Sequence, residues 1–442
     1  MSINHQIVDH DDEQVLSDRG RQLLRMPNDA VDNLIGCFLN PFDEQRNPNG
    51  LINFSTADNK LCTDLVQKKF CDPKMWKPTD MDVLFRSPPN GGEPSTRQAV
   101  VDFVKHFHRC NAPMEPENVV CFTGVTTVFD NLAVALGDPG DVILCPAPQY
   151  LRIQNDFGER AQCRVAPVSM TNANSPSGTF RLLVEEFDAA YERCLQKGER
   201  VFAVLLVNPN NPLGSVHQKS EILPVLQWAK SKELPVLLNE IYANSVYNGH
   251  FESVLSWWHE VPDPEQLIWI WGISKDFCAP GIRFGVCWSM DAEFVNVLRR
   301  IEFTQLSAVV QQGVRHLLTD YDWIENEWFP TNLRRLKDAC AYATGRLEAM
   351  GLKVVGGQAG FFVTVDMRHI LHEKSWASEI ELYEAFKHAG VYLIRGGLQL
   401  CAEPGWFRIV FTVATRHELK TGLDRMESVI KKQRETATAI RD

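Results

Sequence analysis

The chain has 442 residues and a mass of 50.2 kDa, with 44% hydrophobic and 23% charged residues. This length and composition are typical of a globular protein with two or three packing units, and they exclude a disordered, collagen-like or coiled-coil chain. The formal net charge of −11 argues against nucleic acid as a partner, because a negative surface repels phosphate backbones.

The cysteines and the N-terminus indicate a reduced environment. The twelve cysteines are scattered without any C-x-x-C pair, and several, such as Cys121 and Cys145, lie in apolar runs where a thiol behaves as a small hydrophobic group. The first residues, MSINHQIVDHDDEQ, lack the apolar core of a signal peptide, and no apolar run approaches the roughly 20 residues of a membrane helix. We therefore expect free thiols, a cytoplasmic location and no membrane segment.

Helical and strand-like patterns alternate through the middle of the chain. Residues 1–50 are polar and rich in turn formers, so we expect an arm and a loop there. The run VFAVLLV at 201–207 is continuously apolar and β-branched, which is typical of a strand buried on both faces. The alternation predicts an α/β fold with a mostly parallel sheet covered by helices. The expected elements are helices at 97–109 and 126–136 and strands at 118–122, 142–145, 201–207, 236–238 and 267–273.

The pattern changes beyond about residue 320 to that of a smaller α+β domain. A long polar helix is expected over 330–350, followed by strand-like segments at 361–365 and 406–413 and by a terminal helix. We therefore predict three regions, namely an N-terminal arm with part of a small domain (1–60), a large domain (61–318) and a C-terminal small domain (319–442).

Polar and ionisable residues follow three successive strands of the large domain. NPNNPLG (208–214) follows the strand at 201–207, NEIY (239–242) follows the next strand, and SKDFCAPGIRFG (274–285) follows the third. In a sheet of this kind, ligands bind at the carboxyl ends of the strands. This set suits a phosphorylated aromatic aldehyde as cofactor, because the lysine can form an imine while the serine and the arginine hold the phosphate.

These motifs resemble those of the pyridoxal-phosphate-dependent class I/II aminotransferase superfamily, which has fold type I, over roughly residues 50–430. S-K-D-F-x-x-P-G-x-R-x-G at 274–285 is the most specific of them, and EPGWFR at 403–408 resembles the branch of 1-aminocyclopropane-1-carboxylate synthase and related C–S lyases. The resemblance implies an α/β enzyme whose large domain binds pyridoxal 5′-phosphate. It also implies an amino-acid-type substrate and a homodimer.

The resemblance also implies a role for each residue around the cofactor. Lys275 is the Schiff-base lysine and the base that moves the Cα proton. Ser274 and Arg283 bind the phosphate, helped by the backbone of Val125 and Thr126 at the start of a helix, where N–H groups favour an anion.

Four further residues complete the implied site. Tyr150 matches the aromatic residue that stacks on the pyridine ring, and Asn211 and Tyr242 match the pair that hydrogen-bonds the ring oxygen. Arg408 matches the arginine that takes the α-carboxylate of the substrate, because its planar fork suits two oxygens.

The chain departs from the family pattern in three places. Asn239 stands where the family has an aspartate that pairs with the protonated pyridine nitrogen, and the adjacent Glu240 should point to the opposite face of the sheet. The tyrosine that reaches across the family's dimer is replaced near Asn90-Gly91-Gly92. Asp58 stands in place of the synthases' glutamate and is one methylene shorter, which affects its expected contact with the substrate.

These departures favour a reaction that needs little stabilisation of a carbanion. Asn239 is neutral and can donate to an unprotonated ring nitrogen, so the ring becomes a weaker electron sink. We therefore expect α,β-elimination, with C–S cleavage of a cysteine-derived compound in secondary metabolism. The alternatives are an aminotransferase, an enzyme like 1-aminocyclopropane-1-carboxylate synthase, and a catalytically impaired regulator that binds the cofactor.

No metal site is expected from the histidines. His106 and His108 diverge on a helix, because residues two apart do not share a face, so we expect them to be surface residues.

Overall fold

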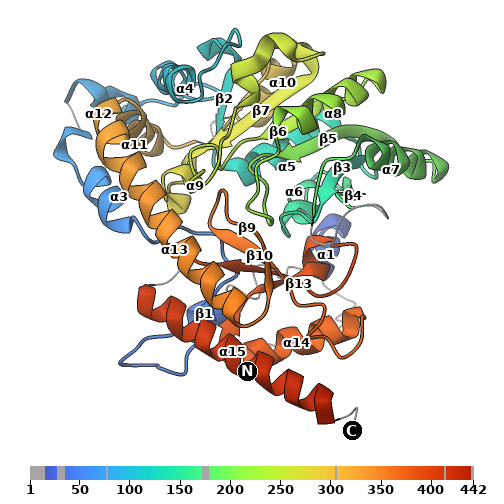
Figure 1. The fold of residues 1–442 in the computed structure, drawn as a ribbon. Helices are drawn as coiled ribbons and strands as arrows, with labels where there is room; N and C mark the ends of the chain where they lie inside the picture. The colour runs from blue at the N-terminus through green and yellow to red at the C-terminus, as the bar shows by residue number, and fades with distance from the viewer. Residues whose placement is uncertain are drawn as a thin grey trace.

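The computed structural model describes residues 15–26, 35–75, 78–171, 179–303, 306–412 and 415–439, and the first fourteen residues of the expected arm lie outside this part. A seven-stranded sheet of order β2-β8-β7-β6-β5-β3-β4 forms the centre of its larger lobe (Figure 1). The strands are β2 (Val119–Phe122), β3 (Val142–Ala147), β4 (Arg164–Ser169), β5 (Val201–Val207), β6 (Val236–Asn239), β7 (Leu267–Gly272) and β8 (Gly285–Trp288).

The sheet is mostly parallel, which confirms the expected fold class. Strands β3 to β7 run parallel to one another, whereas β8 is antiparallel to both β7 and β2. The sequence pattern did not indicate β4 or β8. Strand β4 lies at the sheet edge and exposes Arg164 and Pro167, so it lacks a continuous apolar run. Strand β8 begins at Gly285, the last residue of the long motif at 274–285, so the motif masks its start.

Helices cover both faces of this sheet, and the central strands feed both layers. In β5, Ala203 and Leu205 pack into one hydrophobic core, while Val204 and Leu206 pack into the other. Successive side chains of a strand point to opposite faces, so a strand covered on both sides must be apolar throughout. The helices of this lobe are α4 (Pro94–Phe107), α5 (Val125–Leu136), α6 (Ile153–Gly158), α7 (Val184–Gln196), α8 (Lys219–Ser231), α10 (Ala292–Ile301) and α11 (Ala308–Leu318).

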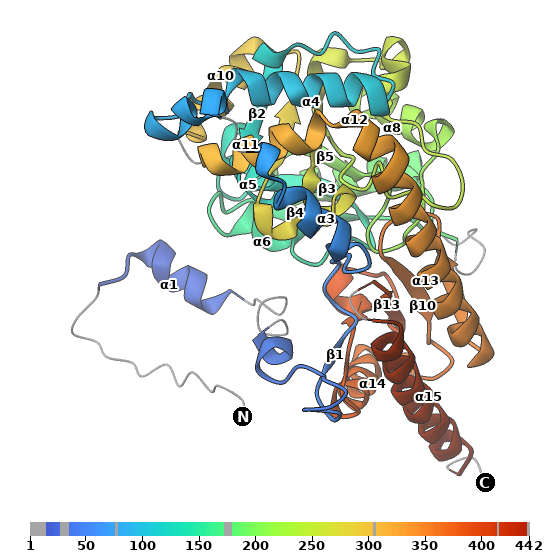
Figure 2. The same cartoon turned by 90° about the vertical axis from the view of Figure 1, so that its left-hand side faces the viewer.

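A smaller lobe holds an antiparallel sheet of order β12-β13-β10-β9. Figure 2 shows helix α13 (Phe329–Ala349) running from the large lobe into the small one, beside the long terminal helix. Strand β1 (Ile52–Asn53) pairs in parallel with β11 (Val391–Tyr392), so the chain before residue 60 contributes to the small lobe. The boundaries at residues 60 and 318 remain predictions. The other elements of this lobe are β9 (Lys353–Gly356), β10 (Phe362–Asp366), β12 (Ile394–Arg395), β13 (Trp406–Val410), α14 (Trp376–His388) and α15 (Arg416–Ala439).

All twelve cysteines lie in the described part of the chain and are free thiols, as expected. Within that part, no helix is both long enough and apolar enough to cross a membrane. The α-helices not yet given include α1 (Asp18–Arg25), α3 (Thr63–Phe70), α9 (Ile273–Asp276) and α12 (Tyr321–Trp323).

Candidate active site

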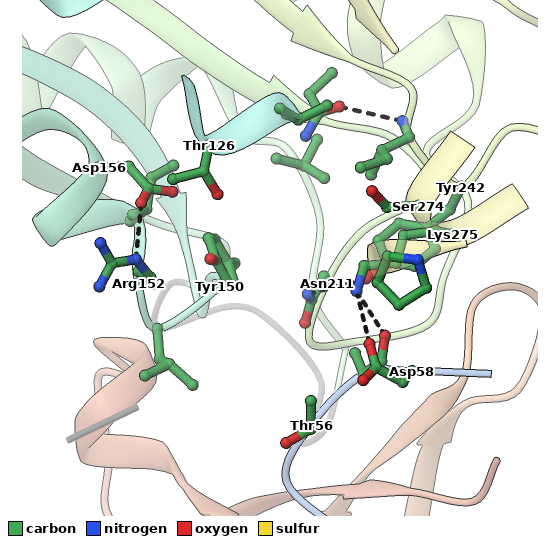
Figure 3. Close-up of a pocket in the computed structure, with 18 of the residues that line it drawn as sticks. Thr56, Asp58, Thr126, Tyr150, Arg152, Asp156, Asn211, Tyr242, Ser274 and Lys275 are labelled. Atoms are coloured by element: carbon green, nitrogen blue, oxygen red, sulfur yellow. Dashed lines mark hydrogen bonds and ion pairs between the residues drawn. The ribbon is translucent and has the colours of Figure 1, made fainter. Parts of the chain in front are cut away.

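A cavity of about 390 Å³ lies where β5, β6 and β7 end and the small lobe meets the sheet. It is lined by residues from the large lobe, from the small lobe and from the segment after β1, and Figure 3 shows their side chains converging on it. All eleven residues expected at the site line this one cavity: Asp58, Val125, Thr126, Tyr150, Asn211, Asn239, Tyr242, Ser274, Lys275, Arg283 and Arg408.

Lys275 stands on α9, the short helical turn that begins immediately after β7. Its Nζ donates to the backbone oxygen of Ala57 at 2.7 Å and lies 3.6 Å from Asp58 Oδ1. Burial lowers the pKa of the Lys275 amine, while the nearby carboxylate of Asp58 opposes that shift. A buried amine whose pKa is depressed is more often neutral, and the neutral amine is the form that attacks an aldehyde or accepts a proton.

The start of α5 and the loop after α9 form a site rich in hydrogen-bond donors. Arg283 has a left-handed backbone (φ +58°), and its Nη1 and Nη2 donate to the carbonyl oxygens of Pro280 (3.0 Å) and Thr123 (3.4 Å). Gly124 caps α5 with φ +94°, and a Cβ placed on it would lie 2.5 Å from Arg283 Nη2. Glycine is therefore required here, because it lets the guanidinium lie against the free N–H groups of the helix start.

A chain of hydrogen bonds joins the two lobes across the cavity. Arg408, in the small-lobe strand β13, donates from Nη1 to Asn211 Oδ1 at 2.8 Å, and its Nη2 donates to the backbone oxygen of Ser55. Asn211 Nδ2 in turn donates to the hydroxyl of Tyr242 at 3.3 Å. Arg408 is 2% exposed, its Nε has no partner in the described part of the chain, and burial lowers its pKa to about 10. The buried guanidinium of Arg408 can therefore donate hydrogen bonds to a carboxylate in the cavity.

Asn239 ends β6 with its amide side chain buried at 5% exposure. Its Oδ1 accepts from the backbone N–H of Ile241 at 3.1 Å, and no described residue bonds to its Nδ2 group. Glu240 faces away, as expected, and accepts from Ser253 Oγ (2.5 Å) and Trp269 Nε1 (2.8 Å) on the far side of the sheet. The strand end therefore offers the cavity a neutral hydrogen-bond donor instead of a carboxylate.

An acidic side chain that sequence reasoning missed lies on α6. Asp156 lines the cavity with a fully buried side chain, and its Oδ1 lies 3.2 Å from Arg152 Nε. Burial raises the pKa of Asp156 to about 8, although Arg152 opposes that shift. Nothing in a six-residue helix marks which polar residue faces inward, so Asp156 could not be predicted from the sequence. The same holds for Thr56 and Ile394, which line the cavity from the other lobe.

The segment that lacks the family's tyrosine has a backbone built for glycine. Gly91 and Gly92 have φ values of +77° and +96°, and a Cβ on Gly92 would lie 2.9 Å from Cys121 Cβ. The N–H of Gly91 donates to the buried Glu302 Oε2 at 2.8 Å. A side chain at Gly92 would be strained by its φ value and would collide with β2.

One expectation about the histidines is wrong. His106 is half-exposed and its Nε2 lies 2.6 Å from Glu325 Oε1, but His108 is 5% exposed. His108 follows α4, where the chain turns inward, and its ring packs edge-on against Trp269 and Trp271 of β7.

Comparison with known proteins identifies the family of this chain. Residues 51–426 match the family model "Aminotransferase class I and II". The chain belongs to this family. Its fold is shared by the aspartate aminotransferase of Thermus thermophilus, solved with maleate, at 20% identity and a TM-score of 0.76, with 94% of this chain and 100% of that chain covered. The protein is therefore an enzyme that depends on pyridoxal phosphate, either an aminotransferase or a lyase.

Curated relatives point to one branch of the family. The chain is 34% identical over 427 residues to 1-aminocyclopropane-1-carboxylate synthase-like protein 1 of Bos taurus, covering 96% of this chain and 84% of that one. It is 30% identical to 1-aminocyclopropane-1-carboxylate synthase 8 of Arabidopsis thaliana, covering 88% and 85%. A mouse relative at 33% identity, covering 88% and 67%, is named a probable inactive 1-aminocyclopropane-1-carboxylate synthase-like protein 2.

The residues of the cavity fit pyridoxal phosphate. The space that a Cβ on Gly124 would fill lies between the Arg283 guanidinium and the start of α5, where donors suit a phosphate. Lys275 supplies an amine for the aldehyde, and Tyr150 lines the same cavity as a half-buried aromatic residue. The fit differs from the family pattern at Asn239, which cannot carry the negative charge that a protonated ring nitrogen attracts.

Proposed function

We propose that this protein is a carbon–sulfur lyase that acts on a cysteine-derived amino acid. The observation that supports this function best is the buried amide of Asn239, whose Oδ1 is occupied by the N–H of Ile241. The remaining Nδ2 group can only donate, so it pairs with a neutral ring nitrogen. A neutral ring stabilises a carbanion poorly, and a substrate whose thiolate leaves from Cβ consumes that carbanion at once.

Each residue of the cavity has a separate proposed role in this reaction. Bound pyridoxal phosphate supplies an aldehyde carbon for the substrate's amine and a ring that delocalises the electron pair left at Cα. Arg408 binds the α-carboxylate, while Tyr242 and Asn211 bond the ring oxygen. Lys275 Nζ accepts the Cα proton, which its lowered pKa permits. The net reaction takes one water and releases a thiol, a keto acid and ammonia.

The cofactor contacts are part of the same proposal. Ser274, Arg283 and the N–H groups of Val125 and Thr126 hold the phosphate, and Tyr150 stacks on the ring. Asp58 lies 3.6 Å from Lys275 Nζ and is close enough to contact the substrate's side chain beside the reacting carbon. The large domain, residues 61–318, is the proposed cofactor-binding unit.

Two other outcomes stay open within this family. An aminotransferase would convert the cofactor to its amine form, and an enzyme like 1-aminocyclopropane-1-carboxylate synthase would form a cyclic product from its substrate. The relative named probable inactive makes a catalytically impaired, cofactor-binding regulator a third alternative. Lys275 and Arg408 at one cavity disfavour the regulator, because binding alone needs no amine at the reacting carbon.

We further propose a homodimer and a cytoplasmic role in secondary metabolism. The dimer is proposed from membership of the family alone. Gly91 and Gly92 imply that any cross-subunit contact with the phosphate differs from the family's tyrosine. Sedimentation of the active enzyme should give a dimer, and a stable active monomer would refute this part.

The test of the function is a product assay. The purified enzyme is loaded with pyridoxal phosphate and incubated with a panel of cysteine conjugates, and thiol, keto acid and ammonia are measured together. We expect the three products in equal amounts. Keto acid with amine-form cofactor and without thiol would show an aminotransferase instead.

A further inference from the structure

Asp276, the residue after Lys275, is buried behind the candidate site. Asp276 is 0% exposed, and its two oxygens accept four hydrogen bonds. Oδ2 accepts from Trp271 Nε1 at 2.9 Å and from the N and Nδ2 of Asn244 at 3.0 Å each. Oδ1 accepts from Ser245 Oγ at 2.7 Å. The donors to Oδ2 can only donate, so this oxygen is a fixed acceptor.

These donors come from the two segments that carry Lys275 and Tyr242. Trp271 lies in β7, directly before the turn of Lys275, and Asn244 and Ser245 lie in the turn that follows Tyr242. The Ser245 N–H donates to the backbone oxygen of Tyr242 at 2.9 Å, so this turn is closed on Tyr242 itself. The Asp276 carboxylate therefore joins the segment of the amine to the segment of the phenol.

We propose that Asp276 is a positioning residue, which fixes the turn of Lys275 against the turn of Tyr242 so that both groups meet the cofactor. This inference rests on the proposed roles of Lys275 and Tyr242. Asp276 itself touches neither substrate nor cofactor, since its carboxylate lies among Trp271, Asn244 and Ser245. It acts through the backbone of α9.

A third segment, the one that carries Trp328, also bonds to Asp276. The backbone oxygen of Asp276 accepts from Trp328 Nε1 at 3.0 Å, and the ring of Trp328 stacks on Phe277 at a centroid distance of 5.8 Å. Trp328 is the last residue of a π-helical turn (Ile324–Trp328), and α13 begins at the next residue and leads into the small lobe. Such turns are frequent at functional sites. The turn of Lys275 is thus also tied to the helix that leads into the small lobe.

His108 completes the network behind Asp276. Asn244 Nδ2 lies 3.0 Å from His108 Nε2 and also donates to Asp276. An amide N–H₂ group has two hydrogens, so one goes to the carboxylate and the other to a ring nitrogen that must carry no proton. Burial lowers the pKa of His108 to about 3, which agrees with a neutral ring.

Glu240 offers a matched comparison. It is also 0% exposed and accepts from Ser253 Oγ, from the Val254 N–H and from Trp269 Nε1. None of these bonds involves a residue of the turn Ile273–Asp276 that carries Lys275, whereas Asp276 itself belongs to that turn. Trp271→Phe and Trp269→Phe therefore each remove one indole N–H from a buried carboxylate in the same sheet, but only the first loosens the turn of Lys275.

The experiment compares these two variants as holoenzymes. Three quantities are measured, namely the pH midpoint of the visible band of bound pyridoxal phosphate, the dissociation constant of the cofactor, and thermal stability. We expect both variants to lose similar stability. Trp271→Phe alone should shift the pH midpoint and weaken cofactor binding about tenfold, which corresponds to the loss of about one hydrogen bond. Equal midpoints and equal dissociation constants in the two variants would overturn the proposal.

A second matched pair of variants provides the same test if the tryptophan variants do not fold. Ser245→Ala removes the donor to Asp276 Oδ1, and Ser253→Ala removes a donor to Glu240. The first should move the pH midpoint in the same direction as Trp271→Phe, and the second should not. If Ser245→Ala leaves the midpoint at the wild-type value, the proposal is wrong. A wild type without a visible band, or a Lys275→Ala variant that keeps it, would instead refute the proposed function of the site.

Discussion

Arg408 Nη1 donates to Asn211 Oδ1 at 2.8 Å, a hydrogen bond that joins a small-lobe strand to the loop after β5. Because Arg408 can only donate, it fixes the orientation of the Asn211 amide and leaves Nδ2 to face Tyr242. The residue proposed for the substrate's carboxylate thus also sets the polarity of the pair proposed for the ring oxygen. With these proposed roles, we expect substrate binding by one lobe to be coupled to the orientation of the cofactor in the other.

Replacing Arg408 by lysine tests this coupling. Arg408→Lys keeps the positive charge but loses the planar fork, so it cannot keep the present bond to Asn211 or bind two carboxylate oxygens side by side. We expect kcat/KM to fall by about 30-fold, which corresponds to about 2 kcal/mol for hydrogen bonds to a charged group. Steady-state kinetics measure it, with Arg416→Lys, an exposed residue over the ring of Tyr342, as the control. An unchanged KM and kcat would show that Arg408 does not bind substrate.

Removing the amine of Lys275 should abolish both catalysis and the visible band of bound cofactor. We expect Lys275→Ala to lose about 10²–10⁴-fold in rate, the range for a positioned base, and to lose more if the imine is also needed. Absorption spectra and single-turnover rates measure this. Lys230→Ala, which removes an exposed amine that donates to the Pro262 backbone, should leave both unchanged. A variant that keeps the visible band would contradict the assignment of Lys275.

Restoring the family's carboxylate should change the product ratio. Asn239→Asp places a buried carboxylate at the end of β6, and a buried charge without a partner is costly. If the ring nitrogen takes a proton in response, the electron sink becomes stronger and side transamination rises relative to elimination. A change of ~1.4 kcal/mol between the competing barriers shifts the ratio tenfold. Thiol and amine-form cofactor are measured on one substrate, and the nearby Asn210→Asp serves as a comparison. A lower share of amine-form cofactor in Asn239→Asp would contradict this account.

The buried His108 predicts a pH dependence of stability. Its folded pKa is about 3 because burial disfavours the charged ring, and an unfolded histidine titrates near 6.5. The unfolded state therefore binds more protons between these values, so the unfolding free energy falls as pH drops below about 6.5. In His108→Phe the unfolding free energy should depend less steeply on pH, by the amount that up to one bound proton contributes. At pH 7.5 the variant should lose about 1 kcal/mol of stability, because Asn244 loses its hydrogen-bond acceptor. Urea unfolding at pH 7.5 and pH 5 measures both effects, with the exposed His250→Phe as control. An unchanged slope would contradict the role given to burial.

Much of the large lobe could be predicted from its apolar runs. Strand β5 has the bounds that the sequence indicates, and β6 and β7 differ from the expected strands by one residue at an end. These strands are covered on both faces, so their sequences are apolar throughout. Strand β4 could not be predicted in this way because it is an edge strand with exposed side chains.

The sequence predicted more of the residues that line the cavity than of the buried residues around it. Lys275, Arg283 and Asn239 follow strand ends, and strand ends of a parallel sheet meet at one edge. Asp156, Asp276 and His108 give no such signal, because their burial depends on which helix or turn packs over them. An acidic residue in a short turn is most often exposed, and only the four donors around Asp276 identify it as buried.

The product balance of the wild-type enzyme tests the central claim most directly. The enzyme loaded with pyridoxal phosphate is given a cysteine conjugate, and thiol, keto acid and amine-form cofactor are measured in the same sample, with Lys275→Ala as the blank. A neutral ring nitrogen beside Asn239 predicts thiol and keto acid in equal amounts over many turnovers, with little amine-form cofactor. Efficient conversion of the cofactor to its amine form, without thiol from any conjugate, would contradict the lyase and establish an aminotransferase.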